Sequence, residues 1–300
     1  MSSSQLERDE RGEVELEAQT HHHQHEQHAE WSAIQARLQA AIIETDTFVW
    51  EDLKLIGGLD LSFLPSENKN EESNEAVACL VILSFPQLEV LYESFLPTKL
   101  NSPYISGFLA FREAPPMVAL VLELRQKHPE LMPQLLIVDG NGVLHPRGCG
   151  LASHVGLKTG LATLGCAKTF LHVDGLETKG VREVMRGGGG GEREGEEVLM
   201  VDGGLGKWRK VEEGKLEDTN VNGSTSCSRS LTLIGASGRT FGMAFCPPGI
   251  TNPLYISVGT GISLPFAMRV VQACCKHRVP EPVRQADLRS RAWIRGRTQG

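Results

Sequence analysis

Three carboxylates stand within or directly after apolar runs of this sequence. Asp60 interrupts the run LIGGLDLSF, Glu113 ends the run FLAFRE, and Asp139 follows the run LLIV at 135–138. A buried carboxylate is costly unless a partner balances its charge. Acids that converge need a cation, and an all-oxygen ligand set suits Mg²⁺, with Mn²⁺ as the other candidate. Spacing alone leaves a second interpretation open, namely three separate cap or surface residues.

The segment after Asp139 has the composition of a ligand-binding loop. An aspartate directly after a buried strand sits at its carboxyl end, where open α/β sheets place their sites. Gly140 and Gly142 let the backbone approach a ligand closely. We expect His145, in the same loop, to reach a metal ion, a phosphate or a base. The simpler interpretation is an ordinary strand-to-loop turn, because Val-Asp-Gly recurs at 173–175 and 201–203.

The elements that must position these residues follow from the spacing of apolar side chains. The run at 135–138 is too short and too apolar for a solvated strand, which indicates a central strand covered on both faces. The whole pattern predicts an α/β fold, with a mixed sheet flanked by helices. The predicted strands are 55–63, 76–85, 87–96, 108–113, 135–138, 169–173, 231–244 (with a turn at 236–238) and 254–258, and the predicted helices are 31–43, 117–128, 151–164 and 263–275.

Composition and charge limit the class of protein. The 300 residues suffice for one core of moderate size or two small ones, and no run approaches the roughly 20 apolar residues that span a bilayer. The first residues lack the basic and apolar regions of a signal peptide, and the seven cysteines show no CxxC pair. A protein with reduced thiols, located in the cytoplasm or nucleus with the nucleolus possible, is therefore expected.

The net charge of −7 is unevenly distributed along the chain. Residues 1–30 contain eight acids and two arginines, whereas seven Lys or Arg and only two acids follow from Lys276 onward. The basic segment is suited to contacts with phosphates, but a solvated tail would have the same composition.

Two segments have the composition of disordered chain. Residues 1–30 are acidic and histidine-rich, which predicts a disordered tail with adventitious metal affinity at most. Residues 177–222 contain five consecutive glycines and the charged run EREGEE, which predicts a low-complexity insertion within the fold.

Four longer motifs carry a resemblance to a known family. The segments PYISGFLAFRE, LLIVDGNGVLHPRG, GLASHVGL and GCAK resemble the motifs of the endonuclease V family, the inosine-directed nucleases, in the same order. The resemblance implies a ribonuclease-H-like fold and a catalytic domain over 31–292, followed by a C-terminal tail at 293–300. It also implies that Asp60, Glu113 and Asp139 bind a divalent metal ion that acts on a phosphodiester.

Further roles are implied by the same resemblance. Tyr104 would wedge into the gap left by an extruded base, and Lys168 would stabilise the scissile phosphate or position water. The inosine pocket would use backbone groups around Gly107, Gly140 and Gly142 to exclude the exocyclic amine of guanine. Without the family, Tyr104 would be a packing residue and Lys168 a surface lysine. His154 is expected to be structural.

One departure from the family pattern affects the expected activity. Thr260-Gly261 replaces a usual His-Arg pair, and Thr260 is expected to face the same end of the sheet as Asp60. Threonine is no proton shuttle near neutral pH, so lowered activity is expected. The alternative is a catalytically weak inosine-binding module, and a third possibility is a hydrolase-like fold that acts on an unrelated ligand.

The favoured function is hydrolysis of a phosphodiester 3′ to inosine, one linkage removed, leaving 5′-phosphate and 3′-hydroxyl ends. The expected partner is inosine-containing single-stranded RNA or DNA, with no membrane and a monomeric chain. HVDGLE and VPEPVRQAD resemble eukaryotic members and favour RNA as a major substrate. A role in inosine-RNA metabolism or DNA repair follows from the resemblance.

Overall fold

A computed structural model gives the fold of this chain and describes residues 26–65, 73–100, 102, 104–186 and 228–298. Residues 1–25 of the predicted tail and residues 187–222 of the predicted insertion lie outside the described residues.

The described residues form one eight-stranded mixed sheet. Its strand order is β3-β2-β1-β4-β5-β8-β7-β6, in which β1, β4 and β5 are mutually parallel and every other neighbouring pair is antiparallel. The strands are β1 (Leu55–Phe63), β2 (Glu75–Ser84), β3 (Val90–Lys99), β4 (Leu135–Val138), β5 (Ala162–Ala167), β6 (Arg229–Ile234), β7 (Thr240–Cys246) and β8 (Leu254–Thr260).

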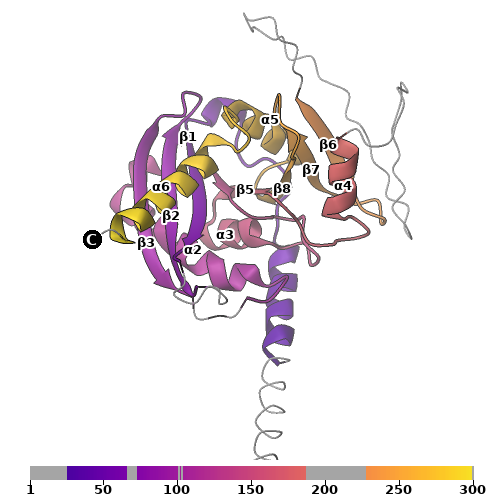
Figure 1. The fold of residues 1–300 in the computed structure, drawn as a ribbon, viewed down its shortest axis with the longest axis horizontal. Coiled ribbons are helices and arrows are strands. Elements are labelled where there is room, and N and C mark those ends of the chain that lie inside the picture. Colours follow the sequence, from indigo (N-terminus) through magenta and orange to yellow (C-terminus); the bar gives the residue numbers. More distant parts are fainter. Residues whose placement is uncertain (1–25, 66–72, 101, 103, 187–227, 299–300) are drawn as a thin grey trace, which may run out of the picture.

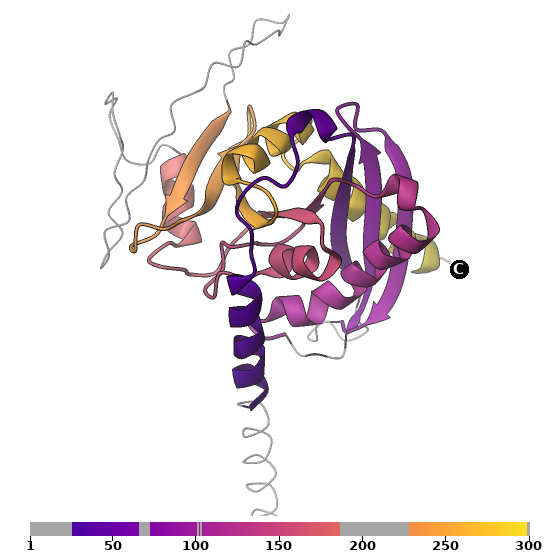
Figure 2. The same ribbon diagram turned by 180° about the vertical axis from the view of Figure 1, so that it is seen from behind.

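Helices cover both faces of the sheet (Figure 1), and the view from behind shows the opposite layer (Figure 2). Side chains of α2 and α3 pack on one face, and side chains of α5 and α6 pack on the other. The named helices are η1 (Trp50–Asp52), α2 (Leu109–Lys127), η2 (Pro129–Leu131), α3 (Leu151–Thr159), α4 (Thr178–Met185), α5 (Leu264–Cys274) and α6 (Glu281–Thr298), and a further N-terminal helix covers residues 26–40. Among the described helices none is both long and apolar enough to cross a membrane.

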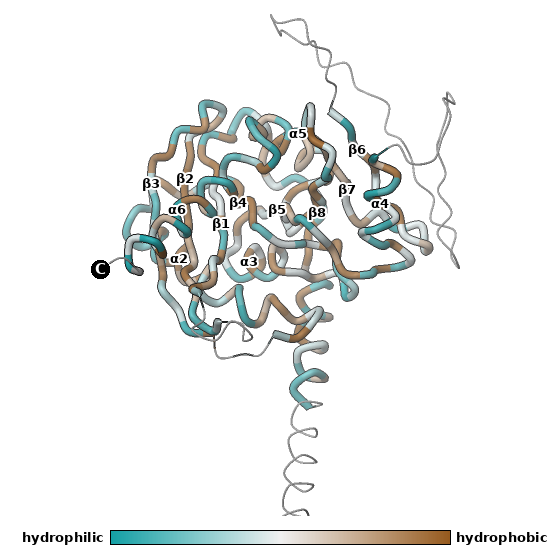
Figure 3. The backbone as a smooth tube through the Cα atoms, in the orientation of Figure 1, coloured by the Kyte–Doolittle hydropathy of each residue, from teal (hydrophilic) through white to brown (hydrophobic). Residues whose placement is uncertain are grey.

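The alternation of side chains along the strands divides the core into two layers. Leu59, Leu80 and Val138 point to the layer under α2 and α3, whereas Ile56 and Ile137 point to the layer under α5 and α6. Because β4 is buried at every position, it is hydrophobic on both faces, as a central parallel strand must be. Hydrophobic stretches, brown in Figure 3, accordingly lie on β2 and β4. The predicted α/β class with a mixed sheet flanked by helices is confirmed.

The predicted strand at 108–113 is wrong. These residues enter α2, which begins at Leu109 and continues through Pro115 and Pro116 to Lys127. Ala110, Ala114, Met117 and Val121 recur at helical spacing and are buried on the sheet, and this burial outweighs the backbone bonds that the two prolines remove.

The boundary between the helix after Gly150 and the next strand was also placed wrongly. The helix ends at Thr159 instead of residue 164, because Gly160 adopts a left-handed conformation with φ 70° that closes the helix. The strand is β5, at 162–167, rather than 169–173. Its small residues, ATLGCA, give a weak hydrophobic signal, which explains the error. The predicted turn at 236–238 lies as expected between β6 and β7.

Three predicted irregular segments contain helix. Residues 26–30 of the predicted tail begin the N-terminal helix, and residues 178–185 of the predicted insertion form α4, whose Val181 and Met185 are buried. Residues 293–298 of the predicted C-terminal tail continue α6. In α4 two apolar side chains suffice to cover one edge of the sheet, and composition averaged over a long window hides them.

Helix α6 approaches β1 more closely than a side chain would allow. A Cβ atom on Gly58 would lie 2.0 Å from the carbonyl oxygen of Pro282 in the first turn of α6. Glycine at this position therefore lets α6 lie directly on the strand that carries Asp60.

We expect Gly58→Ala to push α6 away from β1 and to lower stability by about 1–3 kcal/mol, the usual cost of overpacking a core. Gly180→Ala is the matched control, because a Cβ there meets no atom within 4 Å and alanine favours a helix. Thermal unfolding of both variants measures the effect. Equal melting temperatures for the two variants would contradict the close-approach explanation.

Candidate active site

The parallel strands bring three predicted site residues to one end of the sheet. Asp60 lies near the carboxyl end of β1, Asp139 directly follows β4, and Lys168 directly follows β5. The backbone N–H of Asp139 donates to the carbonyl of Leu59 at 3.0 Å, which extends the β1–β4 pairing to the site. All three residues line one cleft, together with Asp287 and Arg291 of α6. Of the three carboxylates predicted to converge, Asp60 and Asp139 line this cleft and Glu113 does not.

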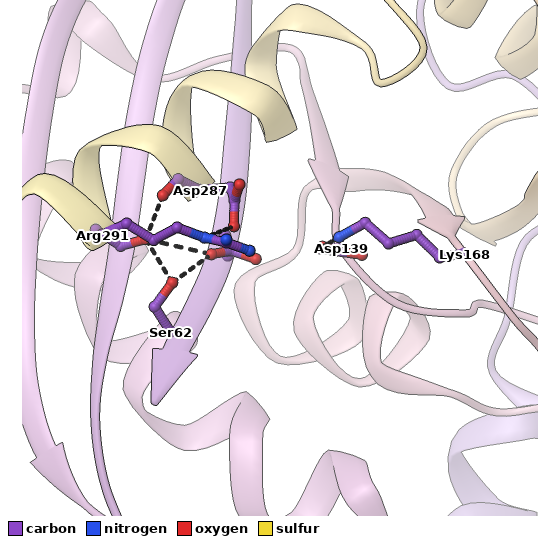
Figure 4. Close-up of polar contacts among 7 residues, drawn as sticks. Ser62, Asp139, Lys168, Asp287 and Arg291 are labelled. Carbon is purple, nitrogen blue, oxygen red and sulfur yellow. Dashed lines mark hydrogen bonds and ion pairs between the residues drawn. The ribbon is translucent and has the colours of Figure 1, made fainter. Parts of the chain in front are cut away.

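An ion pair balances the charge of Asp139. Lys168 Nζ donates to Asp139 Oδ2 at 2.8 Å, and both side chains are partly exposed in the cleft. The ammonium group therefore engages one carboxylate oxygen of Asp139 within the cleft. Figure 4 shows this pair to one side of the cleft, with Ser62 and α6 on the other.

Hydroxyl groups fix the orientation of Asp60. Ser62 Oγ and Ser290 Oγ donate to Asp60 Oδ2 at 3.2 and 3.3 Å, and the two hydroxyls lie 2.7 Å from each other. Asp60 and Ser62 point to the same side because side chains alternate along β1, and Ser290 comes from α6. The second carboxylate oxygen, Oδ1, is therefore the one left to face the cleft.

Burial and mutual repulsion shift the titration of two acids. Burial, together with the charges of Asp139 and Asp287, raises the pKa of Asp60 to about 7. Burial also raises the pKa of Glu113 to about 7; the charge of Arg112 opposes this shift, and the charges of Asp60 and Asp139 favour it. Glu113 comes from the second turn of α2, not from a strand end, and it does not line the cleft, although its charge interacts with those of Asp60 and Asp139.

Asp287 belongs to the cleft and was missed in the sequence. It lies on α6 and accepts from Arg291 Nε at 2.7 Å, one helical turn further on (Figure 4). The signal available was an isolated acid in a strongly basic segment, within the motif VPEPVRQAD. Only the docking of α6 on β1 brings this acid next to Asp60, so local sequence reasoning had no means of placing it.

The donor set of the cleft fits a hard divalent cation. Asp60, Asp139 and Asp287 line the cleft, and the charge of Glu113 interacts with those of Asp60 and Asp139; all four side chains supply only oxygen ligands, which a hard divalent cation prefers. In the part of the chain that the structure describes, no three His, Cys, Asp or Glu side chains are already gathered around a single point as a metal-binding group. A single ion held by three of these carboxylates would therefore require them to lie closer together.

His145 does not lie in the cleft. Its Nε2 is 3.1 Å from the carbonyl oxygen of Gly107, and its Nδ1 accepts from the backbone N–H of Arg147 at 3.2 Å. Burial and the charge of Arg147 lower the pKa of His145 to about 4, so the ring is neutral with its proton on Nε2. The expectation that it reaches an ion or a phosphate is wrong, because the loop turns it toward α2. His154 is also buried, with its ring edge against Phe111.

The glycines of the 140–150 loop serve the protein's own packing. A Cβ on Gly142 would lie 1.9 Å from the carbonyl oxygen of Val258, and its N–H donates to Ser257 Oγ at 2.8 Å. Gly142 is therefore needed for close approach to β8, and its amide is already used. Gly140 stays a predicted pocket residue. Tyr104, 57% exposed beside Gly107, presents its ring to solvent.

Thr260 lies at the wrong end of the sheet for the predicted role. It ends β8, which is antiparallel to β5, and it pairs with Thr163 near the start of β5, whereas Lys168 follows the other end. Its Oγ1 accepts from the backbone N–H of Ile43 at 3.1 Å. The expectation that Thr260 faces the same sheet end as Asp60 is wrong, because the direction of β8 cannot be read from its local sequence.

The fold and the cleft define a ribonuclease-H-like protein with a carboxylate-rich hydrolytic site. Residues 36–288 match the family model described as Endonuclease V. Endonuclease V from Mus musculus is 42% identical over 277 residues, covering 90% of this chain and 70% of the mouse protein, and the Homo sapiens protein is 42% identical over 272 residues, covering 88% and 82%. The chain belongs to the Endonuclease V family.

Solved structures agree with this assignment. The catalytic domain of human Endonuclease V superimposes with a TM-score of 0.73 and 41% identity, covering 91% of this chain and 98% of that one. Ciona intestinalis Endonuclease V, in complex with a 23mer DNA containing an inosine followed by a ribo-adenosine, gives 0.69 and 30%, covering 90% and 98%. The protein is thus a nuclease, and the ribonuclease-H-like fold is confirmed.

The shifted carboxyls generate a prediction for the metal-free protein. Because the folded pKa of Asp60 is raised above its ordinary value near 4, the folded state holds the proton more tightly, and stability falls as pH rises from about 4 to about 7. In chelator at pH 8 we expect Asp60→Asn to melt at least about 2 °C above the unmodified protein, as roughly 1 kcal/mol implies for a domain of this size. At pH 5 the difference shrinks.

Glu89→Gln, an exposed change in the β2–β3 turn, is the matched control and should not alter the pH dependence. If Asp60→Asn were no more stable than the unmodified protein at pH 8, the ionised carboxylate of Asp60 would not destabilise the folded state, and the prediction would be wrong.

Proposed function

We propose that the protein hydrolyses a phosphodiester on the 3′ side of inosine, one linkage removed, in single-stranded RNA or DNA. The products would carry 5′-phosphate and 3′-hydroxyl ends, and inosine-containing RNA is the favoured substrate. The observation that supports this most strongly is the cleft in which Asp60, Asp139 and Lys168 meet at the carboxyl ends of three parallel strands. The inosine complex of the Ciona intestinalis relative supports the choice of base.

Magnesium is the proposed cofactor, with manganese as a possible substitute, and Asp60, Glu113 and Asp139 would hold it, with Asp287 added by the structure. When bound, such an ion supplies charge neutralisation and lowers the pKa of water. Ser62 and Ser290 keep Asp60 Oδ2 occupied and so leave Oδ1 to act as a ligand. Arg291 Nε likewise donates to Asp287 Oδ1 and so orients that carboxylate.

Lys168 would act on the phosphate. Its ammonium pairs with Asp139 at the mouth of the cleft and is about half exposed, so an incoming phosphate can exchange for that partner. The Lys168 ammonium group would stabilise negative charge that develops on the phosphate oxygens during attack. We assign His145 no proton transfer, because it does not line the cleft and both of its ring nitrogens contact backbone groups.

Tyr104 is proposed to fill the gap left by the extruded base. Its exposed ring and its position in the turn before α2 suit a residue that inserts between bases. Gly107 and Gly140 are proposed to line the pocket that receives hypoxanthine. The alternative of a catalytically weak binding module depended on Thr260, and its position at the other end of the sheet gives no reason to expect weak catalysis. A cytoplasmic or nuclear location and a monomeric state remain proposals.

Cleavage of end-labelled strands tests the proposal. With Mg²⁺ or Mn²⁺, we expect the full chain to cut strands that contain one inosine, to spare the same strands with guanosine, and to stop in chelator. Asp139→Ala should lose at least about a hundred-fold in rate, which corresponds to roughly 2.7 kcal/mol, because an ion ligand is removed. Mapping the product ends and comparing RNA with DNA identifies the bond and the substrate.

Binding by the Asp139→Ala protein isolates the role of Tyr104. Adding Tyr104→Ala should weaken binding of the inosine strand by roughly 1–3 kcal/mol, the usual value for base stacking on an aromatic ring, and Tyr104→Phe should not. Undiminished cleavage by Asp139→Ala would exclude the metal site as described. Equal losses from both tyrosine changes would assign the effect to the hydroxyl group and exclude the wedge.

A further inference from the structure

One backbone carbonyl accepts hydrogen bonds from three side chains at once. The carbonyl oxygen of Gly107 accepts from Gln35 Nε2 at 3.1 Å, from His145 Nε2 at 3.1 Å, and from Arg147 Nη2. The donors come from two segments far apart in sequence, the N-terminal helix and the 140–150 loop. Three donors on one carbonyl exceed what is needed to satisfy it, so the arrangement fixes the position of this peptide.

The backbone around Gly107 makes its carbonyl available to these donors. Gly107 adopts a left-handed conformation with φ 80°, and a Cβ there would lie 2.8 Å from Arg147 Nη2. In a regular helix its carbonyl would accept from the N–H of Phe111, but that N–H bonds to the carbonyl of Phe108 at 3.0 Å. The Gly107 carbonyl thus lies outside the α2 ladder and points toward Gln35 and Arg147.

Gln35 connects the two segments. Its side chain is fully buried, and Nε2 donates both to the carbonyl of Gly107 and to the carbonyl of Cys149 at 3.1 Å, while Oε1 accepts from Arg147 Nε. Every polar atom of this amide is therefore used. One side chain fixes the separation between the turn that carries Tyr104 and the loop that begins at Gly140.

Aromatic packing holds the N-terminal helix where Gln35 can act. Trp31 stacks on Phe111 of α2 with ring centroids 4.8 Å apart and an interplanar angle of 6°, and the guanidinium of Arg147 lies 4.0 Å from the centre of the Phe108 ring. Figure 2 shows the N-terminal helix, in indigo, running alongside the start of α2. The helix is thus a fixed support for the turn at 104–108 rather than a loose extension.

We infer that Gln35 is a positioning residue for base selection, which sets the spacing between the 104–108 turn and the 140–150 loop. This rests on the proposed function, in which these two segments enclose hypoxanthine. Guanine differs from hypoxanthine by one exocyclic amine. A pocket can exclude guanine by shape only if the 104–108 turn and the 140–150 loop keep a fixed separation. The buried amide of Gln35 is hydrogen-bonded to both segments and so fixes this separation. Arg147, from the loop, adds a hydrogen bond to the carbonyl of Gly107.

The effect should appear in selectivity and not in the chemical step. Gln35 has no contact with Asp60, Asp139 or Lys168, so its loss leaves the hydrolytic groups in place. A residue that only stabilised the fold would lower the amount of active protein and affect inosine and guanosine strands equally. The ratio of the two cleavage rates therefore separates positioning from stability.

The test uses the full chain with Gln35→Met, which keeps the length of the side chain and removes both donors and the acceptor. Steady-state cleavage with Mn²⁺ is measured over a range of concentrations of an inosine strand and of the same strand with guanosine. We expect the ratio of kcat/KM for inosine over guanosine to fall at least ten-fold, with KM for inosine raised and kcat within about two-fold. Arg37→Ala, an exposed change on the same helix, should match the unmodified protein.

Gln35→Glu provides the second variant, since it keeps the acceptor for Arg147 and loses both donors. It should show the same loss of selectivity if the bonds to the two carbonyls matter, and it replaces Gln35→Met if that protein does not fold. Unchanged selectivity in a folded variant would overturn the inference. An unmodified protein that cuts both strands equally would instead overturn the proposed function, so the two failures are distinct.

Discussion

The site depends on negatively charged side chains that converge at the carboxyl ends of three parallel strands. β1, β4 and β5 run in the same direction, so the residues at their carboxyl ends share one edge of the sheet. Two of these ends carry acids, and α2 and α6 add Glu113 and Asp287. Burial and repulsion raise the pKa of Asp60 and Glu113 to about 7. The fold therefore disfavours the ionised form of these carboxylates, and a bound divalent cation would stabilise that form.

Two glycines let neighbouring backbone segments pack directly against the strands at this end of the sheet. Gly58 lets α6 lie on β1, which brings Ser290 and Asp287 to Asp60. Gly142 lets the loop after Asp139 pack on β8. At these two glycines a helix and a loop contact the sheet backbone directly, and the polar groups of the cleft are oriented by neighbours such as Ser62 and Arg291.

Part of this architecture could be predicted from the sequence. The apolar run before Asp139 identified a central strand, and the carboxyl ends of such strands identified the place of a site. The order and direction of the strands were not available locally, which is why Thr260 was expected at the same sheet end as Asp60. Asp287 was missed because only the docking of α6 on β1 brings it to the cleft. Glu113 was expected on a strand because Pro115 and Pro116 follow it closely, and proline normally breaks a helix. Such errors arise where tertiary contacts override local pattern.

The thermal response to metal tests the central claim most directly. A ligand that binds only the folded state stabilises it, by roughly 2.7 kcal/mol at a hundred times its Kd. We predict that Mn²⁺ raises the Tm of the metal-free protein at pH 7.5, and that Asp139→Asn removes most of this rise while leaving the fold intact. No rise in the unmodified protein, or an equal rise in Asp139→Asn, would contradict the account that these carboxylates are arranged for a cation.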